Sequence, residues 1–216
     1  MSRIHAGPLL VLSVVASLLP PAGRAATEPR EWRFTALLDD KVIGYQSFRL
    51  LEQGQEKVLV SEARYNVKFL FMNVYTYTHD NREVWNGDCL SRIDSRTDDN
   101  GERFFVRGML EQSRLAVESV EGHEQLPACV MTFAYWNPQV LNAKRLLNAQ
   151  TDQYMDVDVA ARGRETITVG GRQRPAQRYE LKTEKFTINL WYSPEQEWLG
   201  LETTTDSGSR LRYRIE

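Results

Sequence analysis

Residues 82–93 read REVWNGDCLSRI, and this stretch indicates how the whole chain folds. Its centre, Asn86-Gly87, is the strongest short hairpin signal in the sequence, because a type I′ turn needs positive φ at both central positions. The turn would join a strand that includes residues 82–84 to a strand over residues 89–93. The stretch therefore predicts a pair of antiparallel strands.

The same period-two alternation of apolar and polar residues runs along almost the whole chain after Glu31. Two distant segments show it clearly, with apolar positions at Trp32, Phe34, Ala36 and Leu38 and at Leu211, Tyr213 and Ile215. Polar and glycine-rich turns separate such segments at residues 39–41, 52–55, 98–101 and 170–171. This rhythm is typical of an antiparallel, mainly β protein.

The pattern breaks once, where Asn137 and Pro138 open a segment with helical spacing. Asn is favoured at the N-cap of a helix, and Pro is favoured at its first helical position. The apolar residues that follow are spaced three, four and seven apart, at Val140, Leu141, Ala143, Leu146 and Leu147. These signals predict one amphipathic helix over residues 138–149.

We therefore expect a mainly β fold, in which a single highly curved antiparallel sheet, or half-barrel, wraps around that one main helix. Because strands twist with a fixed hand, a sheet of about ten strands curls rather than lying flat. A closed β-barrel and a β-sandwich are the alternatives. No linker or low-complexity run divides the chain, so residues 26–216 are expected to form a single β-rich domain.

The composition is that of an ordinary globular protein, with 216 residues, 42% hydrophobic and 26% charged. The 27 basic and 29 acidic residues give a formal net charge of −2. The chain therefore lacks the excess positive charge that proteins use to bind a phosphate backbone. No nucleic-acid partner is expected.

Residues 1–25 have the three parts of a secretory signal peptide: basic residues, an apolar run over residues 9–19, and the small residues Gly23 and Ala25 before a cleavage site. The alternative is a membrane anchor. The apolar run would rise only about 16 Å as a helix, whereas the hydrocarbon core of a bilayer is about 30 Å thick. We therefore expect cleavage after Ala25 and a mature protein that is exported and is not an integral membrane protein.

Export would place Cys89 and Cys129 in an oxidising compartment, where a single disulfide is their natural pairing. The alternative is two free, buried thiols. A redox-active pair is disfavoured, because forty residues separate the two cysteines and the chain contains no Cys-x-x-Cys.

The densest polar cluster comprises His79, Asp80, Asn81, Arg82, Glu83 and Trp85. On a strand, His79, Asn81 and Glu83 would point to one face of the sheet, and Asp80 and Arg82 to the other. His79 and Glu83 could then act as a general base or hold a metal ion. The simpler interpretation, which we prefer, is a polar rim whose groups satisfy one another. We expect no catalytic residues, no metal site and no cofactor.

A second set is aromatic, and comprises Phe71, Tyr75, Tyr135, Trp136 and Trp191. Curved sheets lined by such side chains can hold an apolar ligand, although aromatic residues also pack in cores. Tyr135 and Trp136 directly precede the predicted helix, where they would meet the open mouth of the half-barrel. Trp136 is therefore expected to be partly exposed there and available to a ligand.

Several short blocks occur in an order that looks familiar: residues 79–85, 97–101, 136–141, 146–148, 190–192 and 206–209. Together they resemble an uncharacterised domain-of-unknown-function family of exported bacterial proteins. The carboxy-terminal half is more distantly similar to a family of periplasmic proteins that share the half-barrel of lipoprotein carriers. The resemblance implies a periplasmic location and a lipid or lipid-like ligand, and it supplies no activity.

The sequence thus favours a non-catalytic periplasmic protein that binds an apolar or lipid-like small molecule in a half-barrel concavity. An envelope assembly or protein-interaction factor is the first alternative, and it would need an exposed apolar patch or a free edge strand. A hydrolase that uses His79 and Glu83 is the second.

Overall fold

The computed structural model describes residues 28–69 and 72–216. The predicted signal peptide, its cleavage site and Phe71 lie outside the described residues. The elements are β1 (Arg30–Leu38), β2 (Lys41–Gln53), β3 (Glu56–Phe69), β4 (Met72–Asn86), β5 (Cys89–Asp99), β6 (Glu102–Glu111), β7 (Arg114–Ser119), β8 (Gly122–Pro127), the 3₁₀ helix η1 (Pro138–Asn142), β9 (Arg145–Leu147), β10 (Tyr154–Asp156), β11 (Asp158–Val169), β12 (Arg172–Lys182), β13 (Thr187–Tyr192), β14 (Trp198–Thr204) and β15 (Arg210–Ile215).

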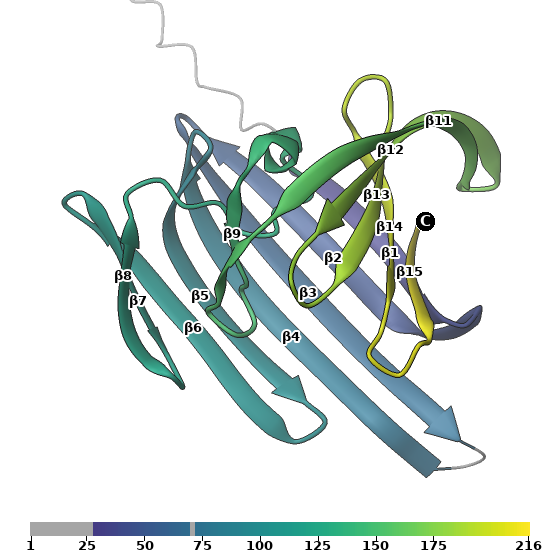
Figure 1. Ribbon diagram of the computed structural model, residues 1–216, viewed down its shortest axis with the longest axis horizontal. Coiled ribbons are helices and arrows are strands. Elements are labelled where there is room, and N and C mark those ends of the chain that lie inside the picture. Colours follow the sequence, from purple (N-terminus) through teal and green to yellow (C-terminus); the bar gives the residue numbers. More distant parts are fainter. Residues whose placement is uncertain (1–27, 70–71) are drawn as a thin grey trace, which may run out of the picture.

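Thirteen of the described strands form one antiparallel sheet, in the order β11-β12-β13-β14-β15-β1-β2-β3-β4-β5-β6-β7-β8 (Figure 1). Strands β1 to β8 follow one another as a meander. The chain then crosses to β11, and its last strand, β15, pairs with β1. The sheet therefore has two free edges, β8 and β11, and the prediction of a mainly β, antiparallel fold is confirmed.

The hairpin predicted from residues 82–93 is present, with a loop shifted by one residue. Asn86 pairs directly with Cys89, so Gly87 and Asp88 form the two-residue loop between β4 and β5. Gly87 has φ of +61°, whereas Asn86 does not adopt positive φ. Glycine adopts positive φ without steric cost, so Gly87 alone supplies the positive φ in this turn.

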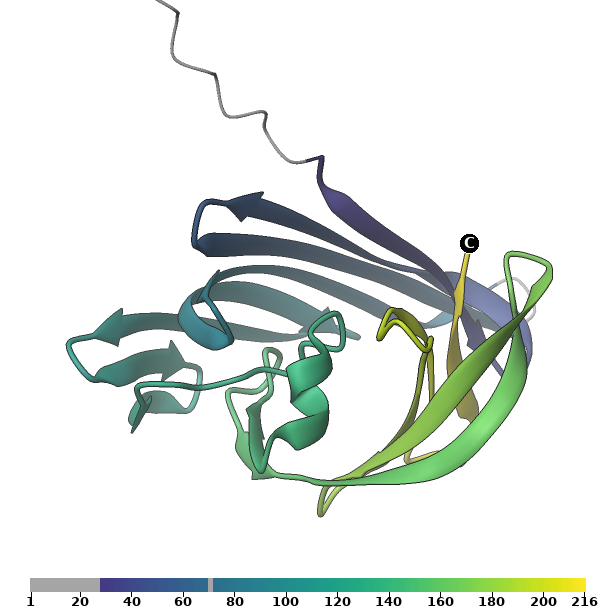
Figure 2. The ribbon, with the colours of Figure 1, turned by 90° about the horizontal axis from the view of Figure 1, so that it is seen from above.

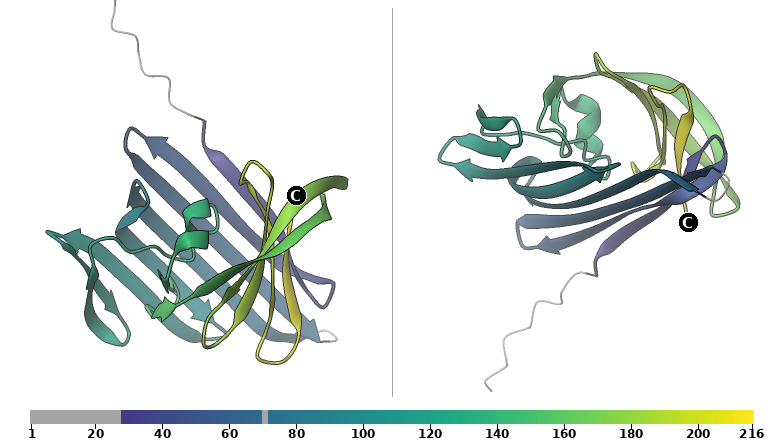
Figure 3. Two further views of the ribbon diagram at one scale, coloured as in Figure 1. Left: turned by 45° about the horizontal axis from the view of Figure 1, so that its top comes forward. Right: turned by 90° about the horizontal axis from the view of Figure 1, so that it is seen from below.

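Residues 128–157, which we call the inner segment, connect the edge strand β8 to the opposite edge strand β11. Figure 2 shows this segment between the flatter sheet of β2 to β6 and the C-terminal strands, which curl around it. Figure 3 shows the same arrangement from two other directions, with β11 and β12 arching over the end of the sheet. The sheet therefore curves around the inner segment.

The predicted helix over residues 138–149 is wrong in its length and type. The structure has a 3₁₀ helix of five residues, Pro138–Asn142, and no main helix in the described part of the chain. Only the start was predicted correctly, because the Oδ1 atom of Asn137 accepts a hydrogen bond from the backbone N–H of Gln139 at 3.1 Å.

The helix ends early because other segments bind the backbone groups that a longer helix would use. Ala143 already has extended backbone, with φ −66° and ψ 148°. Leu147 donates its N–H to the carbonyl of Met131 at 2.8 Å, and Val157 donates its N–H to the carbonyl of Lys144 at 2.9 Å. Strand β9 then pairs with β10 in place of a helical ladder.

The inner segment nevertheless fills the concavity, as the predicted helix was expected to do. Val140, Leu146 and Leu147 are each 0% exposed. They belong to one cluster with apolar side chains of the sheet, among them the fully buried Trp85 and Leu190. Protein packs against both sides of this segment, so the consecutive residues Leu146 and Leu147 are both buried. In the sequence, this spacing of apolar residues looks the same as the apolar face of a helix.

Cys89 and Cys129 form a disulfide, as predicted. The bond joins the first residue of β5 to the beginning of the inner segment. Beside it, the N–H of Leu90 donates to the carbonyl of Val130 at 2.9 Å. The inner segment is therefore fixed to the sheet where it enters the concavity. In residues 28–69 and 72–216, no helix is long and apolar enough to cross a bilayer.

Candidate ligand-binding site

The concavity contains a large cavity, which we call the outer cavity, of about 610 Å³. Strands β2, β3, β4 and β15 supply most of its walls, together with the turn that precedes β15. Apolar and tyrosine side chains dominate the lining, including Ile43, Tyr65, Val67, Tyr75, Tyr77, Leu211 and Tyr213. Its volume falls within the range of about 300–1,000 Å³ that is usual for small-molecule sites.

Tyrosine rings form the inner wall of the outer cavity. Tyr65 and Tyr77 stack with ring centroids 5.2 Å apart. The hydroxyl of Tyr65 lies 2.5 Å from that of Tyr213 and donates to Oε1 of Gln46 at 2.9 Å. Burial raises the pKa of Tyr65 and of Tyr77 well above the usual value, so both phenols are neutral at neutral pH. The wall is therefore uncharged and largely apolar.

A second cavity of about 200 Å³, the inner cavity, lies between the sheet and the inner segment. It shares Tyr77, Gln150 and Tyr213 with the outer cavity, so these three side chains form a partition between the two. The hydroxyl of Tyr77 donates to Oε1 of Gln150 at 3.0 Å. The partition is therefore held by a hydrogen bond between the sheet and the inner segment.

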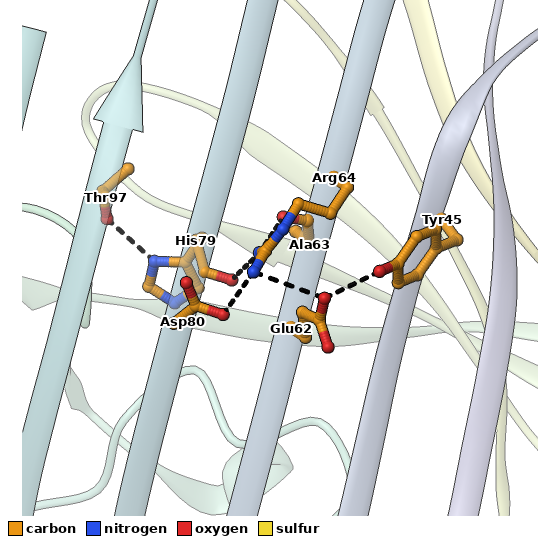
Figure 4. Close-up of polar contacts among 7 residues, drawn as sticks. All are labelled: Tyr45, Glu62, Ala63, Arg64, His79, Asp80 and Thr97. Carbon is orange, nitrogen blue, oxygen red and sulfur yellow. Dashed lines mark hydrogen bonds and ion pairs between the residues drawn. The ribbon is translucent and has the colours of Figure 1, made fainter.

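His79, Asn81 and Glu83 all line the inner cavity, which confirms that they share one face of β4. Asp80 lies on the opposite face, where its carboxylate binds the guanidinium of Arg64 at 2.7 Å. In Figure 4, the His79 ring contacts Thr97 of β5, while Arg64 binds Asp80 and Glu62 and also donates to the backbone carbonyl of His79 at 3.2 Å.

The Glu83 carboxyl is only 2% exposed. Its two oxygens accept hydrogen bonds from Nδ2 of Asn81 and Nε1 of Trp85, each at 3.0 Å. Burial raises the pKa of Glu83, and these donors partly oppose that rise. Glu83 was predicted to belong to a polar rim whose groups satisfy one another; its carboxyl does pair with Asn81 and Trp85, but the inner segment covers this part of β4, so Glu83 is buried and not at a rim.

The His79 ring is held by Thr97, whose Oγ1 lies 2.8 Å from Nδ1 of His79. Burial lowers the pKa of His79 to about 4, although the nearby Asp80 carboxylate acts in the opposite direction. His79 is therefore neutral at neutral pH. Among the described residues, no group of three or more His, Cys, Asp or Glu side chains is placed to hold a metal ion.

The predicted aromatic set is divided among separate places. Tyr75 lines the outer cavity, and Tyr135 and Trp136 line the inner cavity. Trp191 lies on the other face of β13 from the buried Leu190 and Tyr192. Its indole N–H donates to Oε1 of Glu165 at 2.6 Å. Trp191 therefore does not contribute to a shared site with Tyr135 and Trp136.

Trp136 was expected to be partly exposed, and the structure shows that it is 5% exposed. Its ring packs edge-on against Trp85, with centroids 5.6 Å apart. The sequence pattern placed Trp85 in the polar cluster with His79 and Glu83 and not beside Trp136, which lies 51 positions further along the chain; the fold brings the two rings together. Trp136 is therefore part of the core as well as of the cavity lining.

Sequence reasoning missed several residues of the outer cavity, above all Tyr65 and Tyr213. These residues lie 148 positions apart and meet because β15 pairs with β1, where Tyr213 faces Ala36. Period-two alternation indicated that Tyr213 faces inward. Nothing in the sequence indicated which strand would be the neighbour of β15.

The model of a domain of unknown function, DUF6134, matches residues 34–216. The chain belongs to this family. Among curated proteins, no significant match was found. The predicted resemblance to an uncharacterised family is thereby confirmed.

Among solved structures, this DUF6134 domain is similar to a β-barrel-like protein of another domain of unknown function, DUF1849, from Brucella abortus. The TM-score is 0.63 at 10% sequence identity, over 87% of this chain and 95% of that chain. At this identity the likeness shows a shared fold. The barrel-like architecture therefore extends to proteins with little sequence in common.

Proposed function

We propose that this DUF6134 protein is a non-catalytic binding protein that holds an apolar or lipid-like ligand in the outer cavity. The observation that carries the proposal is the cavity of about 610 Å³, with a lining that combines aliphatic side chains and neutral tyrosines. We expect the protein to act in the periplasm, in keeping with the predicted signal peptide.

The lining suits a long apolar group with a polar end. Ile43, Val67 and Leu211 offer aliphatic surface, and each methylene that the ligand buries contributes about 0.8 kcal/mol. Asp99 and Ser207 are polar members of the lining that could meet a ligand's polar end. A few polar groups within an apolar lining are typical of sites that orient a small molecule.

Binding is favoured over the two alternatives by specific contacts. For a hydrolase, His79 and Glu83 would have to converge on a nucleophile, but each is engaged by partners of its own. For an assembly factor that pairs through a sheet edge, one of the two free edge strands, β8 or β11, would have to pair with another strand. Arg162, Arg164 and Glu165 lie along β11, and Glu124 and Pro127 lie along β8. Charged side chains and proline discourage edge pairing.

The test is a titration with a neutral fluorescent fatty-acid ester whose emission rises in an apolar environment; a neutral probe is used because the lining includes Asp99 and Asp206. The variant Val67→Trp fills the outer cavity and is expected to weaken binding at least about tenfold. Val60→Trp is the matched control, because Val60 lies on the same strand but is 39% exposed and does not line the cavity. The proposal fails if the wild type does not bind the probe, or if both variants bind it as the wild type does.

A further inference from the structure

Three residues that line the inner cavity each carry a buried polar atom without a hydrogen-bond partner in the part of the chain that the structure describes. The Oδ1 atom of Asn81, the Oγ1 atom of Thr132 and the Nε1 atom of Trp136 have no hydrogen-bond partner within the described residues. The three residues are 7%, 0% and 5% exposed, and all three line this cavity. Burying unpaired polar atoms destabilises a fold, so a concentration of them in one cavity needs an explanation.

We infer that the inner cavity is a second ligand site, which binds a neutral group rich in hydroxyls, such as a small polyol or a single sugar. This inference goes beyond the proposed function, because it concerns a different cavity and does not require the outer one to be filled.

The unpaired atoms define the hydrogen bonds that the ligand must make. The amide oxygen of Asn81 only accepts, the indole N–H of Trp136 only donates, and the hydroxyl of Thr132 can do either. A hydroxyl group both donates and accepts, so a ligand with several hydroxyls can satisfy all three atoms. Thr132 also influences the neighbouring Glu83 carboxyl, without making a hydrogen bond of normal geometry.

The charges around the cavity favour a neutral ligand. No Lys or Arg lines the cavity, and Glu83 would repel an anion. Lys57 lies over the ring of Trp136, 5.8 Å from its centroid, but does not line the cavity. The oxygens of Glu83 are already occupied by two donors, so they do not call for a cation.

The volume of the inner cavity and its aromatic walls further restrict which ligands fit. A volume of about 200 Å³ admits a group as small as glycerol or one sugar ring, and not a long acyl chain. Phe48, Phe133, Tyr135 and Phe186 supply aromatic surface for the C–H groups of such a ligand. Its hydroxyls would then reach the polar side chains on β4 and the inner segment.

Two kinds of ligand could bring a hydroxyl-rich group into the inner cavity. The group can be a free polyol or sugar. It can also be the polyol head of an amphiphile whose apolar part lies in the outer cavity, because Tyr77, Gln150 and Tyr213 border both spaces.

The test follows the indole N–H signal of Trp136 by NMR while glycerol, glucose or monooctanoylglycerol is added to the protein. The chain has five Trp residues, and the Trp136→Phe variant identifies the signal that belongs to Trp136. We expect a saturable shift of that signal with at least one of the three probes. A response to glycerol or glucose assigns the site to free ligands, and a response to monooctanoylglycerol alone assigns it to an amphiphile's head group.

Thr132→Val removes one unpaired hydroxyl and is expected to weaken that probe's binding by about fivefold or more, which corresponds to one hydrogen bond. Thr151→Val is the matched control, because Thr151 also has a buried, unpaired hydroxyl but does not line the cavity.

The inference is overturned if none of the probes moves the Trp136 signal, which would mean that the cavity holds only water. It is also overturned if Thr132→Val and Thr151→Val bind the probe equally well. Val67→Trp separates this result from the proposed function, because filling the outer cavity should leave the binding of a free polyol unchanged.

Discussion

The disulfide between Cys89 and Cys129 gives a prediction whose magnitude follows from the structure. The two cysteines are separated by 40 positions and enclose strands β5 to β8. In the chain-entropy model, opening a loop of this length costs about 4 kcal/mol of stability. The N–H of Leu90 still donates to the carbonyl of Val130 beside the bond, so the native arrangement has a local contact that survives the loss.

The assay is urea unfolding of the oxidised protein, of the reduced protein and of the variant Cys89→Ala/Cys129→Ala. Reduction and substitution should each lower the free energy of unfolding by about 4 kcal/mol. Both forms should still bind the fluorescent fatty-acid ester below their transitions, because the disulfide lies outside the lining of the outer cavity. A loss below about 1 kcal/mol would refute the reasoning that this bond restrains the unfolded chain.

Three further predictions concern the inner segment and the polar face of β4. Leu147→Ala should lower the free energy of unfolding in urea by about 3–4 kcal/mol, because Leu147 is 0% exposed. Leu141 is half-buried, so Leu141→Ala should lower it by only about 1 kcal/mol. Equal losses would contradict the role of Leu147 in the core. Asn137→Ala should cost about 2 kcal/mol, because the side chain caps η1 and also donates to Asp88, and a cost near zero would show that neither bond matters. The pKa of His79 is lowered to about 4 in the folded protein, so as pH falls the imidazole is protonated in the unfolded chain first, and the wild type should lose stability between about pH 6.5 and about pH 4. His79→Gln should remove about 3 kcal/mol of that loss. Parallel curves of stability against pH for the two proteins would contradict this account.

Protonation of Glu83 does not affect the difference in stability between the wild type and His79→Gln. Burial raises the pKa of Glu83, so its protonation stabilises the folded protein as pH falls, which is opposite in sign to the effect of His79. Because Glu83 is present in the wild type and in His79→Gln, its contribution cancels in their difference.

The strands could be predicted from the sequence because their information is local. Alternation of side chains along β4 placed His79, Asn81 and Glu83 on one face, and turn residues such as Gly87 marked where strands end. The prediction of a helix over residues 138–149 was wrong because backbone groups of this segment bond to parts of the chain outside it. The N–H of Leu147 binds the carbonyl of Met131, a partner that helical spacing alone cannot reveal.

The candidate site was predicted only in part, for the same reason. Tyr75, which the sequence singled out, lines the outer cavity, but its neighbours Tyr65 and Tyr213 meet there through the pairing of β15 with β1. The error at Trp191 was avoidable, because Leu190 and Tyr192 alternate with it and are buried on the other face of β13. Burial of Trp136 depends on its contact with Trp85, which no local pattern shows.

The most direct test of the central claim is native mass spectrometry of the protein isolated from its own source without detergent. The account predicts a bound species that adds mass to the intact protein, dissociates on unfolding and has the composition of an apolar or amphipathic small molecule. The same preparation of Val67→Trp should lack it, while Val60→Trp should retain it. A wild-type protein that carries nothing and takes up no apolar probe would contradict the assignment of the outer cavity as a binding site.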